Sequence, residues 1–351
     1  MATLTQASIF SKKAFKWIIL TIILSVFLIV FLAFGKSVRD SIFAPAAPPA
    51  TVAFGKIRQL DLSIGISPPA SAEYSVETLT GDLPQLPAYA KVYAVEANKF
   101  SFGDLDRAKR RAQNIGFTNE PEQISPGLVN FIDPKDDQRV LTIETSTDNF
   151  TLKSNFKNDP NVITTKIASL DDVQNRARDF LVNLGVNGDE FPLDNTEVQK
   201  LRIDGGSLTD ALILHQTNLA KVIFKRAPLD KIPIISPNDK TPPVYVMVSS
   251  REIVEANVDI AKVQRFKFAT YPLKGVQKAF QELKAKKAAF NKNVQSNQLA
   301  IRDVTLGYLE SKMNGPYIQP VYLFKGNDFI AYVPAVDDGW IIKTATGSTG
   351  N

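Results

Sequence analysis

Hydrophobic and polar positions divide the chain into one long apolar run followed by a region of alternating pattern. Residues 17–34, WIILTIILSVFLIVFLAF, contain no charged side chain. An α-helix rises about 1.5 Å per residue, so a run of this length matches a hydrocarbon core about 30 Å thick. After Thr51, stretches of period-2 alternation are interrupted by a few segments with helical spacing. The pattern predicts a single N-terminal transmembrane helix followed by an α+β fold, in which helices pack on antiparallel sheets.

The residues that flank the apolar run predict its orientation. Lys12, Lys13 and Lys16 precede it, and Trp17 stands where an interfacial aromatic residue is expected. Basic flanks stay on the cytoplasmic side, so we expect the rest of the chain to lie outside the plasma (inner) membrane of a bacterium. The lipid bilayer is therefore the first predicted partner. A cleaved signal peptide is the alternative, because residues 44–46 resemble a cleavage site, but its apolar run would be only about 7–15 residues long.

Three stretches of the exported region have the apolar spacing of helices. They are residues 102–115, 170–184 and 273–290. Ser101 and Ser169 stand at N-cap positions of the first two, and Gly116 and Gly185 stand where a left-handed residue ends a helix. The stripe of the first helix that is expected to face the core consists of Leu105, Ala108, Ala112 and Ile115. Aligning the two glycines also aligns similar flanking residues, which leaves an internal duplication open.

These elements predict the organisation of the whole chain. The expected parts are a cytoplasmic N-terminus (1–16), a transmembrane helix (17–34), a Pro/Ala-rich linker (35–50), a first α+β unit (51–165), a second α+β unit (166–265), a C-terminal unit (266–345) and a disordered tail (346–351). The linker contains APAAPPA, and proline favours extended backbone, so this segment should hold the exported part away from the membrane.

The C-terminal unit carries a resemblance to a known family. After the third helix come Val304–Leu309 (VTLGYL), Tyr317–Tyr322 (YIQPVY) and Ala331–Ala335 (AYVPA). Together they resemble the C-terminal part of PepSY-like domains, and most closely the membrane-anchored YycH/YycI type of histidine-kinase regulator. The resemblance covers residues 272–336. It implies helix-plus-antiparallel-sheet units outside the membrane, without a catalytic site to carry over. Another envelope family built from PepSY-like units fits equally well.

Composition excludes several kinds of function. The chain has 41 basic and 36 acidic residues, and four of the lysines lie in the first 36 residues, which contain no acid. The exported part is therefore almost neutral and lacks the basic footprint of a nucleic-acid-binding protein. The absence of cysteine excludes disulfides and thiolate metal sites. His215 is the single histidine, and we interpret it as structural. No nucleotide or hydrolase motif is present, so we expect no cofactor, metal or catalytic residue.

Two groups of residues are candidates for contact with a partner. Tyr308, Tyr317, Tyr322 and Tyr332 gather in the C-terminal unit, where alternation allows either core positions or a contact surface. The basic run 107–111 could meet anionic lipid or an acidic partner, although a solvated helix face explains it better.

The sequence therefore predicts a non-enzymatic, membrane-anchored extracytoplasmic module that binds or regulates another envelope protein through direct contact. The alternative is an exported hydrolase that uses two carboxylates on envelope glycan or peptide, because such a pair can lie far apart in the chain. This alternative requires a deep polar cleft with two facing carboxyl groups. Binding of a small ligand between the units also stays open.

Overall fold

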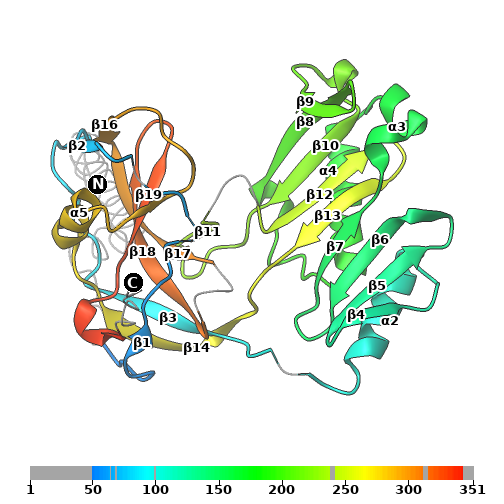
Figure 1. Ribbon diagram of the computed structural model, residues 1–351. Helices are drawn as coiled ribbons and strands as arrows, with labels where there is room; N and C mark the ends of the chain where they lie inside the picture. The colour runs from blue at the N-terminus through cyan, green and yellow to red at the C-terminus, as the bar shows by residue number, and fades with distance from the viewer. Residues whose placement is uncertain are drawn as a thin grey trace, which may run out of the picture. The chain divides into compact units, whose positions relative to one another are not determined.

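The computed structural model describes residues 50–342, apart from residues 64, 68, 99, 238–241 and 311–314. Most of its strands belong to two large sheets, and helices are few (Figure 1). The expected membrane helix, 17–34, and its flanking residues Lys12, Lys13, Lys16 and Trp17 lie outside the described residues, as does the C-terminal tail. Among the residues that are described, no helix is both long and apolar enough to cross a membrane.

The larger sheet has nine strands in the order β4-β5-β6-β7-β13-β12-β10-β8-β9, and each neighbouring pair is antiparallel. Its strands are β4 (Glu122–Ser125), β5 (Leu128–Asp133), β6 (Asp136–Glu144), β7 (Asn149–Lys153), β8 (Thr196–Asp204), β9 (Ser207–Asp210), β10 (Leu219–Phe224), β12 (Val244–Ser249) and β13 (Ile253–Val258). The antiparallel pairing agrees with the predicted α+β class.

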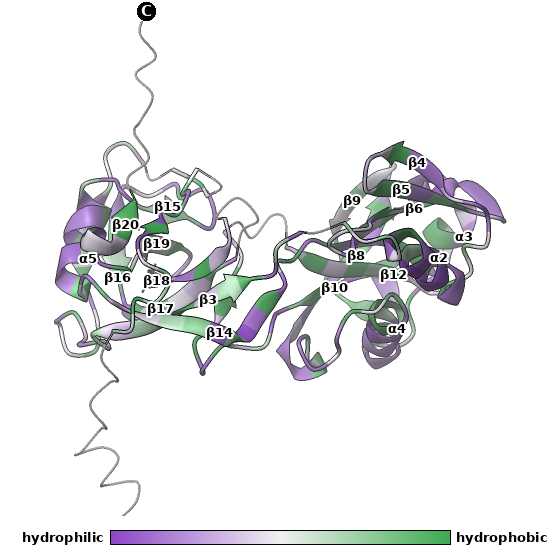
Figure 2. Ribbon diagram, turned by 90° about the horizontal axis from the view of Figure 1, so that it is seen from below, coloured by the Kyte–Doolittle hydropathy of each residue, from purple (hydrophilic) through white to green (hydrophobic). Residues whose placement is uncertain are grey.

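One face of this sheet is covered by helices α2 (Asp104–Asn114) and α4 (Leu170–Asn183). Alternate strand residues such as Val222, Val246 and Leu152 are buried against alanines of both helices. Figure 2 shows hydrophobic residues along many strands, whereas α2 and α4 are largely hydrophilic in colour. The opposite face carries a smaller cluster around the short helix α3 (Pro160–Thr164).

The helix ends show which local signals were interpreted correctly. Gly116 and Gly185 have φ values of 93° and 87°, the left-handed conformation expected after a helix. The Ser169 side chain accepts a hydrogen bond from the amide of Asp172, as an N-cap should. The N-cap predicted at Ser101 is wrong: α2 begins after Gly103, and the Asp104 carboxylate accepts a hydrogen bond from the Ser101 amide.

The second sheet has seven strands and contains the C-terminal unit. Its order is β11-β17-β18-β19-β15, with β3 paired to both β14 and β18. The strands are β3 (Tyr89–Val95), β11 (Ile234–Ile235), β14 (Val263–Pro272), β15 (Ala289–Phe290), β17 (Asp303–Leu309), β18 (Tyr317–Lys325) and β19 (Ile330–Pro334). Two parallel pairs flank it: β1 (Ile57–Arg58) with β20 (Ile341–Ile342), and β2 (Glu73–Val76) with β16 (Gln298–Ile301).

Helix α5 (Val276–Lys284) packs on the second sheet and is shorter than the predicted helix 273–290. Gly275, at φ 86°, precedes it, and Lys286 adopts φ 61° just after it. The left-handed turn at Lys286 ends the helix, so Ala289–Phe290 is free to pair with β19 as a strand. Lysine here occupies the position that glycine takes after α2 and α4.

The division of strands between the sheets differs from the expected unit boundaries. Residues expected in the first and second units share the nine-stranded sheet, joined where β7 pairs with β13. β3, expected in the first unit, pairs with β14 in the other sheet. The ends of α2 and α4 meet, since the Asn114 amide donates to the Asn183 carbonyl at 3.3 Å. Each of these asparagines stands two positions before the glycine that ends its helix, so aligning Gly116 with Gly185 also aligns Asn114 with Asn183.

Candidate functional site

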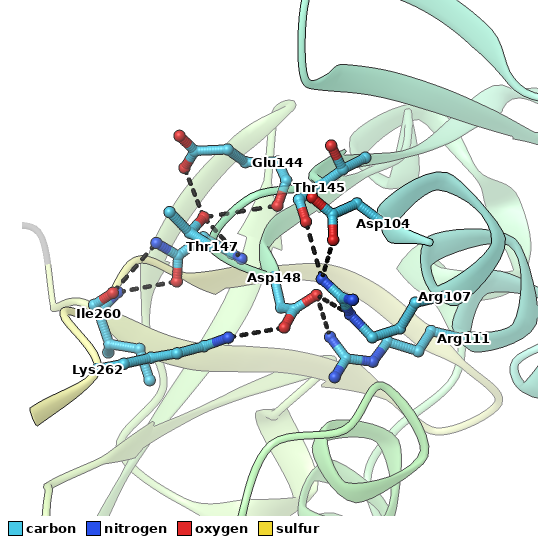
Figure 3. A network of polar contacts seen from close by, with 10 residues as sticks. Asp104, Arg107, Arg111, Glu144, Thr145, Thr147, Asp148, Ile260 and Lys262 are labelled. Atoms are coloured by element: carbon cyan, nitrogen blue, oxygen red, sulfur yellow. Dashed lines mark hydrogen bonds and ion pairs between the residues drawn. The ribbon is translucent and has the colours of Figure 1, made fainter. Parts of the chain in front are cut away.

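A network of polar contacts centres on Asp148, in the turn between β6 and β7 (Figure 3). Asp148 has φ 64°, a left-handed conformation that aspartate tolerates better than most residues. The turn places its carboxylate against α2 and against the segment that follows β13. Three distant parts of the chain therefore meet at one side chain.

Three cations bind this carboxylate. Arg107 Nε and Arg111 lie 2.9 and 2.8 Å from Oδ1, and Lys262 Nζ lies 2.7 Å from Oδ2. Arg107 also contacts the Asp104 carboxylate at 3.0 Å and donates to the Thr145 carbonyl at 3.1 Å. These contacts hold α2 to the β6–β7 turn.

The same contacts explain most of the basic run 107–111. Arg107 and Arg111 are bound to Asp148, and Lys109 lies 2.7 Å from Glu120. Their charges are balanced by carboxylates of the same chain. This arrangement favours the interpretation as a charged helix face over a site for anionic lipid.

The protonation state of Asp148 follows from opposing effects. Partial burial alone would raise the pKa of its carboxyl, but the hydrogen bonds from Lys262 and Arg107 and the charge of Arg111 outweigh burial and hold the pKa below its usual 3.8. The carboxylate is thus ionised at neutral pH, and both oxygens are occupied. Such a group is a poor general acid, because that role requires a raised pKa.

A cavity of about 1150 Å³ adjoins this cluster. Its lining includes Glu96, Arg107, Asp148, Lys262 and Lys267. Glu96 and Asp148 are the carboxylates among the lining residues that the structure describes, and Asp148 is already bound by three cations. The described residues also contain no group of three histidine or acidic side chains placed to hold a metal ion.

A second ionic cluster is almost completely buried. Arg226 donates to Glu190, to Glu310 and to the Ala261 carbonyl, and its side chain is 3% exposed. Burial raises the pKa of the Glu310 carboxyl, while the charge of Arg226 opposes the shift. The charge of Glu190, which shares the same guanidinium, adds to the upward shift of the Glu310 pKa.

The four candidate tyrosines do not form a common surface. Tyr308, Tyr322 and Tyr332 are at most 1% exposed, and each hydroxyl reaches a backbone group: the carbonyl of Lys91, the amide of Gly275 and the carbonyl of Pro237, respectively. Tyr317 is half-buried and stacks on Phe54. The contact-surface interpretation is wrong for the three buried tyrosines, because their rings fill the core.

Exposed apolar side chains gather instead at the start of α2. Phe102 is fully exposed, Phe100 is 69% exposed and Leu105 is 42% exposed. The ring of Phe100 lies against Gly127 in the β4–β5 turn, so close that a Cβ there would clash. We call Phe100, Phe102 and Leu105 the α2 apolar surface.

Leu105 was expected to face the core, and that prediction is wrong. The buried stripe of α2 runs through Asp104, Ala108 and Ala112 instead. Asp104 takes the buried position in the first turn because Arg107 and the Ser101 amide satisfy its carboxylate. The prediction assigned only apolar residues to the buried stripe of α2, and it therefore missed the buried aspartate.

Comparisons with known proteins give similarity of fold alone. No family model matches the chain, and no curated protein matches it in sequence. Among solved structures, YycH from Bacillus subtilis is similar at a TM-score of 0.33 and 12% identity, over 72% of this chain and 53% of YycH. The C-terminal domain of YpeB from Bacillus megaterium is similar at a TM-score of 0.30 and 14% identity, over 68% and 95% of the two chains.

The chain thus spans about half the length of the YycH structure. YycH, the type of protein that residues 272–336 resemble in sequence, is thus among the similar solved structures.

Proposed function

We propose that this protein is a non-enzymatic, membrane-anchored extracytoplasmic module that binds another protein of the cell envelope through the α2 apolar surface. The observation that supports the proposal is the exposure of Phe100, Phe102 and Leu105 on one side of the nine-stranded sheet. Large apolar side chains grouped on a protein surface mark interaction sites, and aromatic residues often supply most of the binding energy.

The neighbouring strand gives this surface a second means of contact. β4 is an edge strand of the sheet, and all four of its residues are exposed. An exposed edge offers free amide and carbonyl groups to an extended segment of a partner. Phe100 packs on the turn that follows β4, so the apolar surface and the strand edge are continuous at Gly127. The partner proposed here offers an extended strand with apolar side chains.

The Asp148 cluster supplies the rigidity that such a surface needs. Arg107 and Arg111 tie α2 to the β6–β7 turn, two strands away from β4 in the sheet. A contact surface that is already ordered binds with a smaller loss of conformational entropy. The predicted anchor at 17–34 would confine the surface to the vicinity of the membrane, where an envelope partner is concentrated.

Photo-crosslinking tests this proposal with the full-length protein in its own cells. A photoreactive phenylalanine analogue at Phe102 should form a crosslink to one discrete envelope protein. The control places the same analogue at Leu79, which is equally exposed but belongs to the other sheet region. A Phe102→Asp substitution should abolish crosslinking from a probe at Phe100. Equal crosslinking from positions 102 and 79, or none from 102, would contradict the proposal.

A further inference from the structure

Strand β14 contains an unusual bulge. Val263 pairs with Val95 and Phe268 pairs with Tyr93, so four residues of β14 lie opposite a single residue, Ala94, of β3. We call these four residues, Gln264–Lys267, the β14 bulge. Bulges bend a strand and redirect its side chains. Here the bulge presents Phe266 with its side chain 100% exposed.

The base of the bulge is held by specific contacts. The Arg265 guanidinium donates to the carbonyls of Ala227 and Pro228, at 3.5 and 3.3 Å. Phe268, at the end of the bulge, packs on the ring of Tyr93 with centroids 5.7 Å apart, and the Lys91 ammonium lies 4.0 Å from the Phe268 centroid. Phe266 is therefore displayed on an ordered support.

The charges beside Phe266 are both positive. Arg265 and Lys267 are the sequence neighbours of Phe266. The charge of Arg265 is among the causes that lower the pKa of the nearby Asp230 carboxyl, and Lys267 lines the cavity beside the Asp148 cluster. An exposed aromatic ring next to two basic residues in the chain complements a membrane surface, where anionic headgroups lie above an apolar layer.

The chain leading to the predicted anchor joins the fold at the same strand. The Thr51 amide donates to Thr270 Oγ1 at 2.8 Å, and the Val52 amide donates to the Thr270 carbonyl at 3.0 Å. Thr270 is four positions from Phe266, which is at most about 13 Å of extended chain. The sixteen residues of the linker 35–50 would span at most about 58 Å if fully extended. The β14 bulge thus belongs to the strand that pairs with Thr51 and Val52, the residues that directly follow the expected linker.

From these observations we infer that the β14 bulge docks on the anionic lipid surface of the membrane that holds the protein. Phe266 enters the headgroup region, and Arg265 and Lys267 contact lipid phosphates. The inference rests on the anchoring at 17–34 that is part of the proposed function. Tethering raises the effective concentration of the bulge at the bilayer, so a contact with one ring and two cations suffices. Docking would fix the orientation of the exported part relative to the membrane.

The natural chain contains no cysteine, which allows a specific test. A Phe266→Cys variant of the full-length protein is labelled with the environment-sensitive fluorophore NBD and reconstituted into vesicles of phosphatidylcholine with phosphatidylglycerol. NBD at position 266 should show a blue-shifted emission and quenching by lipids that carry a spin label near the headgroup. A Leu212→Cys variant, labelled at an exposed apolar site in the loop after β9, should show neither effect.

The charge requirement is tested in the same system. Pure phosphatidylcholine, high salt, or Arg265→Gln with Lys267→Gln should reverse the shift, with about a fivefold lower docking constant per cation removed. Equal quenching at positions 266 and 212, or a shift at 266 only after envelope proteins are added, would overturn the inference. Vesicle flotation after an alkaline wash reports anchoring separately. Protein lost in that wash contradicts the predicted anchor, whereas retained protein with an aqueous label at 266 contradicts the docking alone.

Discussion

Replacing Arg226 with methionine tests the most buried ion pair among the described residues. The guanidinium is 3% exposed and bridges Glu190 and Glu310, whose side chains are 23% and 7% exposed. After the replacement, Glu190 can be hydrated, whereas Glu310 remains buried with the Ala261 amide as its remaining donor. Removing one partner of a buried pair costs about 3–5 kcal/mol, because the other charge is left without compensation.

The loss should depend on pH in a defined direction. Burial raises the pKa of Glu310 above its ordinary 4.5, and Arg226 opposes this shift. A carboxyl with a raised pKa binds its proton more tightly in the folded state, so stability falls as the pH rises above about 4.5. Without Arg226 this fall extends to higher pH. The difference in folding stability between the variant and the natural protein should therefore be smaller at mildly acidic pH than at neutral pH.

Thermal unfolding followed by circular dichroism measures both effects. At neutral pH the midpoint should drop by roughly 10 °C, given about 2–4 °C per kcal/mol for domains of similar size. Combining Arg226→Met with Glu310→Gln should recover at least half of the loss, because no buried charge then remains unpaired. A drop below about 2 °C, or a double variant no more stable than Arg226→Met alone, would refute the reasoning.

Three further predictions concern stability. Asp148→Asn should lower the free energy of unfolding by about 2 kcal/mol; because the pKa of Asp148 lies below 3.8, its stabilisation is lost only as the pH falls below that value, and acid titration should show a shallower loss in the variant. Asn218→Leu removes a buried amide that donates to the carbonyls of Val162, Ile163 and Thr165, and urea unfolding should show a loss of about 2–3 kcal/mol. Lys286→Gly removes the strain of a lysine in the left-handed conformation. It should raise the free energy of unfolding by up to about 1 kcal/mol, measured as a higher melting midpoint.

Local signals in the sequence predicted local structure well. Gly116, Gly185 and Ser169 do what their residue types favour, because the determinants of a helix end lie within a few positions. Leu105 shows where such reasoning fails. The orientation of α2 depends on Asp104, whose burial is stabilised by Arg107, and Arg107 is in turn positioned by Asp148 from a turn about 40 residues away. The spacing of apolar residues within a helix cannot predict such a contact with a distant turn.

The interpretation of the tyrosines as a contact surface was wrong for a different reason. Period-2 alternation distinguishes an inner from an outer face only when one face of a strand meets solvent. In β18, Tyr322 and Phe324 belong to the cluster under α5, while Val321 and Leu323 belong to a second cluster on the opposite side. Both faces are buried, so alternation cannot identify a surface. The β14 bulge could not be predicted from the sequence either. A residue counts as extra only by comparison with the residues of the partner strand, and the sequence does not give that pairing.

The two proposed surfaces belong to different sheets, and this separation makes them independently testable. Phe102 lies beside the nine-stranded sheet and Phe266 lies on a strand of the other. If partner binding and lipid docking are independent, Phe102→Asp should leave the NBD signal at position 266 unchanged, and Arg265→Gln with Lys267→Gln should leave crosslinking at position 102 unchanged. If the partner alters the docking constant by some factor, docking must alter partner affinity by the same factor, because coupling between two binding equilibria is reciprocal. Measuring the NBD shift with and without the crosslinked partner therefore determines whether membrane docking regulates partner binding or only holds the module in place.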